Sequence, residues 1–354
     1  MMSIRSISIK VIALLILLVG LNMLYMNTLW KKDLDKEADM LLELLNKQDT
    51  CDILYFGESS NFTPDSFELC KKYISELTAE YYPSLRLASV DRPAMHAGIY
   101  LSVIKNIPAT AKVKTLIVTM NLRSFGANWI HSKLETPLQK SNVMYQLYPP
   151  LVNRFMLSLN CYEKKNEVER DADMKKQWVN EPFHFPYPFK YKTVIEWDKA
   201  VGEGSFLNPD GSWDMLKIGL ATSYIKTYGF QINTETNPRI KDFDEIVAVA
   251  KQKKLNIVFN LLAENVAYAD SLVGKDLVFL MQQNKQLLID RYTQKGALVV
   301  DNFEVVRGKD FIDQRWTTEH YKERGRRTIA KNVAEELKKI YPSQFVEQLK
   351  NQSN

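Results

Sequence analysis

The chain has 354 residues, of which 45% are hydrophobic and 25% are charged; this is the composition of a packed globular protein and excludes disorder over most of its length. The net charge of +5 is scattered among acidic neighbours, so there is no basic stripe for a phosphate backbone, and nucleic acid is not an expected partner. The cysteines and the four histidines have no metal-ligand spacing, so neither a metal nor a cofactor is expected.

Residues 11–29 form an uncharged apolar run with basic residues on both sides. As a helix this run would be roughly 28 Å long, which matches the hydrocarbon thickness of a bilayer. A cleaved signal peptide and a buried core helix are the alternatives, but no small-residue cleavage site follows, so an uncleaved anchor is favoured. The short tail before it favours a cytoplasmic N-terminus and an exported domain, in which Cys51–Cys70 is the favoured disulfide. One disulfide with a free thiol, or three buried thiols, fit the cysteine count equally well.

Beyond the anchor, short apolar runs of strand length alternate with segments of helical spacing. This alternation predicts a mostly parallel sheet with helices on both faces, a three-layer α/β/α fold. The expected strands are 51–56, 85–90, 115–120, 255–262 and 297–300, and the expected helices are 64–81, 93–107, 242–252, 276–295 and 323–340. Lys322, Arg324, Arg326 and Arg327 are predicted to form a solvated face at the start of the last helix.

The pattern breaks down between the third and fourth strands, where more than a hundred residues are too many for a simple connection. This stretch holds four of the six tryptophans, which either stack on sugar rings or belong to a core. The predicted organisation is a tail and transmembrane anchor (1–31), a helical stalk (32–50), a catalytic α/β domain (51–125 and 239–345) and an aromatic-rich insertion or cap (126–238).

Three polar side chains follow or precede elements that end at the same edge of the predicted sheet. Ser59 lies in a Gly-Glu-Ser turn after the first strand, Asn121 follows the third, and His320 precedes the last helix. Ligands of parallel sheets bind at the carboxyl ends of the strands. A serine there, with a histidine as base, is the arrangement for nucleophilic catalysis, whereas a serine that only caps a helix is the structural alternative.

These blocks resemble those of the SGNH/GDSL hydrolase superfamily, in which Gly-Asp-Ser follows the first strand and Asp-x-x-His precedes the last helix. The corresponding segments here read DILYFGESSN and WTTEHYKERGRRTIAKNVAEEL, and VTMNLRSF matches the third block of the family at Asn121 only. The resemblance covers residues 51–125 and 240–340. It implies an SGNH or flavodoxin-like sheet, Ser59 as nucleophile, and His320 as base. It also implies oxyanion donors at the Ser59 N–H, Asn121 and a residue of DRPAMHAG, either Ala94 or Gly98.

The sequence departs from the family at the acid that orients the histidine, because Thr317 occupies its usual position. A hydroxyl cannot stabilise an imidazolium as a carboxylate does. The acid is therefore expected to be Asp313 or Glu319, or the site works as a Ser–His dyad. Neighbouring side chains normally diverge, so Glu319 is the poorer candidate and Asp313 the better one. Glu58 replaces the aspartate of Gly-Asp-Ser.

The resemblance extends to membrane-anchored branches that work with membrane O-acyltransferases on envelope polysaccharides, an association rather than a physical argument. The sequence thus predicts a single-pass membrane protein with an extracytoplasmic esterase or acyltransferase domain. Its expected substrate is an O-acyl, chiefly O-acetyl, group of envelope carbohydrate, and a membrane O-acyltransferase is a candidate partner. The alternatives are an inactive binding or assembly protein that keeps the fold, and a lipid esterase with an apolar pocket.

Overall fold

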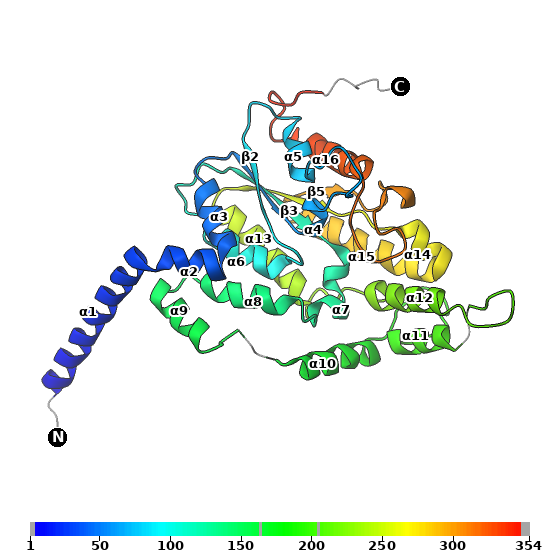
Figure 1. Cartoon of the computed structure of the whole chain (residues 1–354), viewed down its shortest axis with the longest axis horizontal. Coiled ribbons are helices and arrows are strands. Elements are labelled where there is room, and N and C mark those ends of the chain that lie inside the picture. The colour runs from blue at the N-terminus through cyan, green and yellow to red at the C-terminus, as the bar shows by residue number, and fades with distance from the viewer. Residues whose placement is uncertain (1–3, 163–164, 204–205, 348–354) are drawn as a thin grey trace.

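A computed structural model of the chain describes residues 4–162, 165–203 and 206–347. Over these residues the chain forms one five-stranded sheet, in the order β2-β1-β3-β4-β5, in which every pair is parallel. Helices cover both faces of the sheet (Figure 1), so the predicted α/β class is confirmed. The strands are β1 (Ile53–Gly57), β2 (Leu87–Asp91), β3 (Thr115–Met120), β4 (Asn256–Leu261) and β5 (Leu298–Asp301).

Alternate side chains of the buried strands enter two different cores. In β1, Leu54 and Phe56 belong to one core, whereas Ile53 and Tyr55 belong to the other. This is the period of two that a strand imposes when helices cover both of its faces. The first core is covered by α6 (Ala97–Lys105), α13 (Pro238–Gln252) and α15 (Lys275–Gln294), and the second by α5 (Ile74–Ala79) and α16 (Glu323–Leu337).

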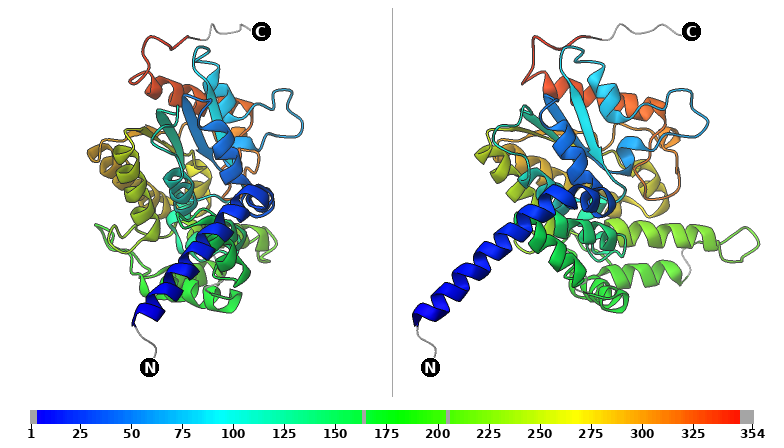
Figure 2. Two further views of the ribbon diagram at one scale, coloured as in Figure 1. Left: turned by 90° about the vertical axis from the view of Figure 1, so that its left-hand side faces the viewer. Right: turned by 60° about the vertical axis from the view of Figure 1, so that its left-hand side comes forward.

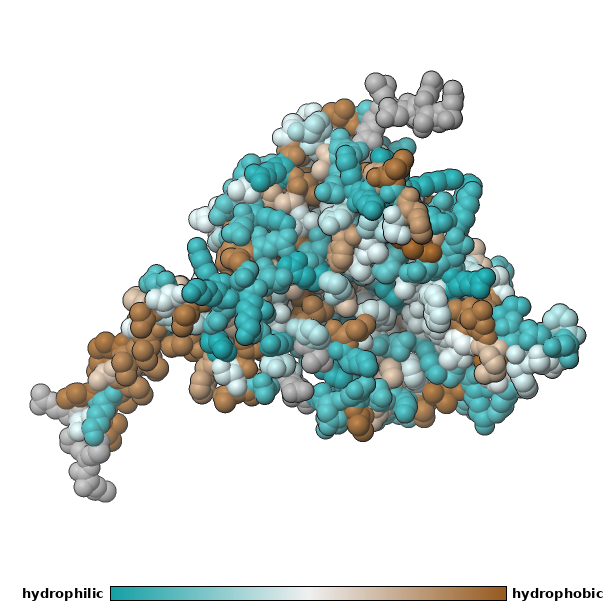
Figure 3. All heavy atoms as spheres, in the orientation of Figure 1, coloured by the Kyte–Doolittle hydropathy of each residue, from teal (hydrophilic) through white to brown (hydrophobic). Residues whose placement is uncertain are grey.

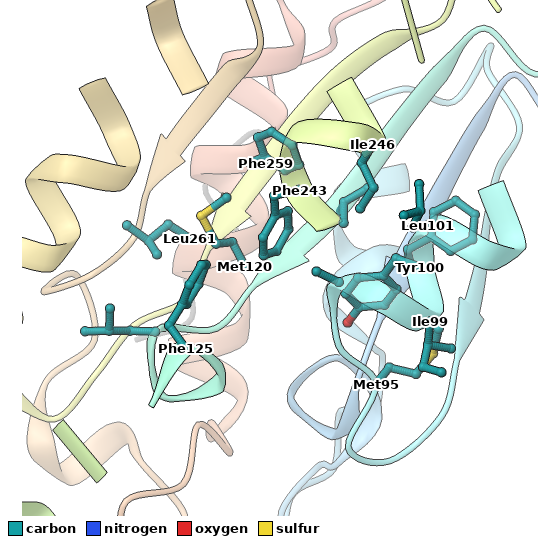
Figure 4. Close-up of a cluster of buried hydrophobic side chains, with 14 of the residues drawn as sticks. Met95, Ile99, Tyr100, Leu101, Met120, Phe125, Phe243, Ile246, Phe259 and Leu261 are labelled. Carbon is teal, nitrogen blue, oxygen red and sulfur yellow. The ribbon is translucent and has the colours of Figure 1, made fainter. Parts of the chain in front are cut away.

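Aromatic rings hold α13 against the sheet and against the turn that follows β3. Phe243 of α13 stacks on Phe125 with ring centroids 5.6 Å apart and meets Phe259 of β4 edge-on at 5.3 Å (Figure 4). Each of the three rings is buried, which stabilises the fold by about 2–3 kcal/mol per side chain. The turn after β3 is therefore fixed to the body of the domain.

Helix α1 (Ile4–Thr28) projects from the domain (Figures 1 and 2) and exposes a continuous apolar surface (Figure 3), as predicted for the N-terminal segment. The stretch Ser6–Thr28 is long and apolar enough to cross a membrane, and its apolar window is not buried by the rest of the chain. Membrane anchors and signal sequences share these properties, so what the structure shows is a helix that is able to span a bilayer.

The segment expected to be a stalk is instead part of the domain. It forms two helices, α2 (Trp30–Glu37) and α3 (Asp39–Lys47), which are separated by a break at Ala38. Ion pairs join both helices to the rest of the domain: Asp33 to Arg154, Glu37 to Lys140 and Asp39 to Arg92. Of the leucines expected on one side of the stalk, Leu41 and Leu44 are buried in the first core, and Leu42 and Leu45 pack against it partly buried.

The insertion is helical. Trp178 and Trp197 are buried, so these two rings are core residues rather than exposed platforms for sugars. The last insertion helix, α12, packs against the segment after β4, where Tyr224 and Tyr268 lie with ring centroids 5.7 Å apart. The insertion helices are α7 (Ala127–Ile130), α8 (Glu135–Met144), α9 (Pro150–Ser158), α10 (Glu167–Asn180), α11 (Val194–Gly202) and α12 (Met215–Tyr228).

The helix expected over residues 64–81 is wrong in its first half, because α5 begins only at Ile74. Residues 63–73 form a loop that is fixed by Arg326, whose guanidinium donates to the backbone oxygens of Lys72 and Cys70 and to the Glu68 carboxylate. Arg326 is fully buried, so the prediction of a solvated face is also wrong at this residue. Buried guanidinium groups need such partners because desolvating the charge is costly.

The cysteines are free thiols in the structure. Cys51 is buried, Cys70 is partly buried and Cys161 is exposed. Cys51 packs in the first core, whereas Cys70 packs against the second core from the loop before α5. The Cys51–Cys70 bridge is therefore absent, and the alternative of three buried thiols is correct only for Cys51, because Cys70 is partly buried and Cys161 is exposed.

Candidate functional site

The turn that carries Ser59 begins at a glycine with no room for a side chain. A Cβ atom on Gly57 would lie 2.2 Å from Oδ1 of Asp91 and 2.9 Å from Cβ of Asn61. The short helix α4 (Ser59–Phe62) follows, and the Glu58 carboxylate accepts a hydrogen bond from Ser60 N at 3.3 Å as its cap. The hydroxyl of Ser59 is thereby placed at the carboxyl end of β1, half-buried.

Asn61 ties this short helix to the neighbouring strand and helix. Its amide nitrogen donates to Asp91 Oδ1 at 2.8 Å and to Ser75 Oγ at 3.1 Å, and its oxygen accepts from Ser75 N at 2.8 Å. Burial raises the pKa of Asp91 to about 6, against the opposing effect of hydrogen bonds from Ser89 and Asn61. Because Asn61 is fully buried, these bonds fix the position of the residues before it, including Ser59.

The loop before α16 folds back on itself and brings Asp313 beside His320. Phe311 and Tyr321 form an antiparallel bridge, and Ile312 N donates to His320 O at 2.9 Å. Residues on either side of such a pairing face one another despite their separation in the chain. The 3₁₀ turn η2 (Gly308–Asp310) leads into this loop.

Ser59, His320 and Asp313 form a continuous series of hydrogen bonds. Ser59 Oγ lies 3.1 Å from His320 Nε2, and His320 Nδ1 lies 2.9 Å from Asp313 Oδ2. A carboxylate only accepts, so Nδ1 donates to it and the neutral imidazole presents a lone pair at Nε2 to the serine hydroxyl. Thr318 Oγ1 donates to the same Asp313 oxygen at 2.9 Å. A hydroxyl, a base and an orienting carboxylate in this order can carry out acyl transfer.

A second carboxylate lies beside the serine. Ser59 Oγ is 3.1 Å from Glu58 Oε2, the same distance as from His320 Nε2. The hydroxyl has one hydrogen, so it donates to only one of these two acceptors at a time. Glu58 is buried and belongs to the floor of the site, whereas the side chains of His320 and Asp313 are 22% and 39% exposed and form its open side.

Glu319 does not contact the imidazole; it points into the domain. Its side chain is 1% exposed and lies 2.5 Å from Arg123 Nη2, while Arg123 Nη1 donates to Thr317 O at 2.5 Å. The guanidinium of Arg123 also lies over the Trp129 ring, 4.4 Å from its centroid. Of the two carboxylates, Asp313 is therefore the one that contacts the imidazole, whereas Glu319 pairs with Arg123.

The floor of the site is a buried group of three carboxylates and one guanidinium. Burial raises the pKa of Glu319 to about 7, Arg123 opposes this shift and Glu58 adds to it. Burial is the main cause that holds the pKa of Glu264 well above its usual range, and the negative charge of Glu319 adds to it. Tyr228 of α12 donates to Glu264 Oε2 at 2.5 Å, which connects the insertion to this floor.

Asn121 follows β3 at the sheet edge where Ser59 follows β1, and its side chain already has a partner of its own. The two strands are neighbours in the sheet, with Phe56 paired to Val118. The side-chain oxygen of Asn121 accepts from Arg123 N at 3.1 Å at the start of the 3₁₀ turn η1 (Leu122–Phe125), and its side chain acts to lower the pKa of Glu319. A role in binding an oxyanion would use the amide NH₂ group, because the oxygen already accepts from Arg123 N.

The backbone N–H of Gly98 already has a hydrogen-bond acceptor. It donates to His96 Nδ1 at 3.2 Å at the start of α6, and a Cβ atom on Gly98 would lie 3.0 Å from Asp242 Oδ2 of α13. His96 is buried next to Arg239, and burial holds the pKa of His96 well below its usual range. This arrangement does not support the expectation that Gly98 donates to an oxyanion, and it makes His96 a structural residue.

Sequence reasoning missed Arg123, Glu264 and Thr318. Glu264 follows β4 by three residues and Arg123 follows β3 by three, so both lie at the edge where ligands of parallel sheets bind. Their charge and their position just after predicted strands could have identified Arg123 and Glu264 as site residues. Across the described parts of the chain, no three His, Cys, Asp or Glu side chains come together in a way that would hold a metal ion.

Comparison with known proteins does not extend this picture. No family model and no curated protein matches the chain. A solved structure aligns with 83% of this chain and 98% of its own, at 10% identity and a TM-score of 0.32. A likeness this weak carries no argument about function.

Proposed function

We propose that the protein is a serine esterase or acyltransferase in which Ser59 is the nucleophile, His320 the general base and Asp313 the group that orients it. The observation that carries this proposal is the unbroken hydrogen-bond series from Asp313 through His320 to Ser59. A carboxylate within hydrogen-bond reach of the imidazole supports an enzyme over an inactive protein that keeps only the fold. The series has the roles of a serine hydrolase triad, which is recognised by geometry rather than by position in the chain.

In the first half of the reaction, Ser59 Oγ attacks the carbonyl carbon of an acyl ester while its proton passes to His320 Nε2. The charged imidazolium is stabilised by Asp313, which also fixes the ring so that Nε2 faces the serine. The tetrahedral intermediate then collapses. The bond to the alcohol oxygen breaks, and that oxygen takes the proton from Nε2, leaving the acyl group on Ser59.

In the second half, water or a sugar hydroxyl attacks the acyl-serine and gives its proton to His320 Nε2. The bond to Ser59 Oγ breaks, and Oγ recovers the proton from the imidazolium. Water yields the free acid, and a sugar hydroxyl yields a new ester. The Ser59 N–H at the start of α4 and the Asn121 amide are the proposed donors to the oxyanion, because both lie at the end of adjacent strands.

The proposed substrate is an O-acyl group, chiefly O-acetyl, on carbohydrate of the cell envelope. A cleft of about 370 Å³ between α10 and residues 229–233 is lined by Gln177, Gln231, Trp178 and Phe230, but not by Ser59, His320 or Asp313, so it does not bear on the substrate of this site. The family resemblance of the sequence is what supports the proposed carbohydrate substrate. With it we propose that α1 spans the membrane, that the domain is extracytoplasmic, and that a membrane O-acyltransferase is a partner.

The test is covalent labelling with a fluorophosphonate probe, followed by peptide mass analysis. The full-length protein is expected to be labelled at Ser59, and Ser59→Ala is expected to abolish both the label and the hydrolysis of p-nitrophenyl acetate. The matched control is Ser60→Ala. The Ser60 hydroxyl is buried and finds no hydrogen-bond partner among the described residues, so its loss should leave the label in place.

Two outcomes would redirect the proposal. If the folded protein is not labelled and hydrolyses no acyl ester, it is a binding or assembly protein that retains the fold. If it is labelled but prefers long-chain esters to acetylated sugars, the chemistry stands and the carbohydrate substrate is wrong.

A further inference from the structure

Helix α9 lies beside the domain end of α1, at the point where the apolar helix meets the rest of the chain (Figures 1 and 2). The backbone N–H of Leu151 in α9 donates to Oδ1 of Asn22 in α1 at 3.0 Å. Arg154 of α9 pairs with Asp33 at 3.0 Å, and Tyr25 of α1 donates to the same carboxylate at 2.7 Å. These contacts fix α9 against the last turns of α1.

The outer face of α9 is apolar and uncovered. Val152, Phe155 and Leu159 follow one another at helical spacing and are 43%, 63% and 60% exposed. Leu147 and Tyr148, just before the helix, extend the same exposed group. The opposite face carries residues that are buried against the domain, Asn153 and Leu157. A helix with one apolar face left open in this way needs a partner for that face.

The position of α9 along α1 indicates which partner this is. Asn22 precedes Thr28, the last residue of α1, by six positions, which places the contact about 9 Å inside the end of the apolar helix. Interfacial helices bury their apolar face roughly 5–10 Å into the boundary between headgroups and acyl chains. Lys31 and Lys32, which are exposed just beyond α1, lie at the level where anionic headgroups would be.

We infer that α9, together with Leu147 and Tyr148, lies in the interfacial layer of the bilayer leaflet from which α1 emerges, with Phe155 and Leu159 in contact with lipid. The occupant of the apolar face is lipid because α9 contacts α1 within its apolar run and lies at the depth of its final turns. This inference rests on the proposed membrane anchor and adds a second attachment point to it.

The experiment uses the full-length chain in vesicles of phosphatidylcholine with one-fifth phosphatidylglycerol. Cys70 and Cys161 are changed to serine, and the buried Cys51 is kept. An environment-sensitive fluorophore is then attached at one introduced cysteine in each of three variants: Phe155→Cys in α9, Leu15→Cys within α1, and Leu207→Cys as the matched control. Leu207 is 58% exposed, and the loop between α11 and α12 that carries it lies far from α1 (Figure 1).

Spin-labelled lipids are expected to quench the fluorophore at position 155 at least threefold more than at position 207, and quenching by a shallow spin label should exceed that by a deep one. The inference is overturned if position 155 behaves like position 207 while position 15 is quenched by lipid, and the anchor then stands alone. If position 15 is not quenched, or the mass of the chain shows that α1 has been removed, the anchor fails and the inference fails with it. Quenching at 155 that depends on protein concentration rather than on labelled lipid would assign the face to a second copy of the chain and overturn the inference.

Discussion

Replacing Asp313 with asparagine removes a negative charge from the proposed triad and changes the shape of the side chain very little. In the structure Asp313 Oδ2 accepts from His320 Nδ1 and from Thr318 Oγ1, each at 2.9 Å. An asparagine that turns its NH₂ group toward Nδ1 makes that nitrogen an acceptor, so the ring proton moves to Nε2. With Nε2 protonated, His320 has no lone pair to receive the Ser59 proton.

The expected loss of turnover follows from this tautomer change and from the exposure of the carboxylate. In the serine protease template the same substitution lowers kcat by about 10⁴. The Asp313 side chain is 39% exposed, so water screens its charge more than in a buried triad, and we expect a loss of about 10³. That factor corresponds to about 4 kcal/mol in the activation barrier.

The assay compares kcat for p-nitrophenyl acetate and the rate of fluorophosphonate labelling in the parent and in Asp313→Asn, with urea unfolding measured in parallel. The matched control is Asp290→Asn, since that carboxylate accepts a hydrogen bond from Gln286 on the surface of α15. A variant that unfolds like the parent but loses less than tenfold in both rates would refute the orienting role of Asp313.

Two further predictions concern buried polar groups near the site. Burial raises the pKa of Glu319 from its usual 4.5 to about 7, so the folded state binds the proton more tightly than the unfolded state, and the free energy of unfolding should fall as the pH rises from about 4.5 through 7. Thermal melts of Glu319→Gln should show a smaller dependence of stability on pH. An unchanged dependence would mean that other groups cause it. Asn61→Ala removes the bonds to Asp91 and Ser75 and should lower the free energy of unfolding by about 2–4 kcal/mol in urea titrations. Asn180→Ala, which loses one exposed bond, is the control, and equal effects of the two changes would contradict the positioning role.

The sheet and the meeting of Ser59 with His320 followed from the sequence because both depend on local patterns. Apolar runs of strand length alternate with helical segments, and in a parallel sheet this alternation places every strand end at one edge. The choice of Asp313 over Glu319 also followed, since adjacent side chains in an extended segment point to opposite sides. The structure adds how Asp313 reaches His320 across seven positions in the chain: the backbone of Ile312 pairs with that of His320.

The remaining features depend on contacts between distant segments, which no local pattern contains. Residues 63–73 have helical spacing, yet they form a loop because their backbone oxygens bind the buried Arg326 of the last helix. Gly98 was an acceptable oxyanion donor by its position in the chain, but the His96 ring takes its N–H. The charged floor of Arg123 and Glu319 joins a residue after β3 to one in the last loop.

The attachment of α2 and α3 to the domain has a consequence for where the serine can act. A flexible linker of twenty residues would let the distance between a domain and the membrane vary by about 25 Å, so a tethered enzyme would reach substrates over that range of distances. Here the chain is helical from Trp30 to Lys47 apart from the break at Ala38. The pairs of Asp33 with Arg154 and Glu37 with Lys140 fix α2 to the insertion, and the pair of Asp39 with Arg92 fixes α3 to the segment after β2. With α1 held in lipid, Ser59 would stay at one elevation above the bilayer, and a polymer would have to be drawn past that level to be modified.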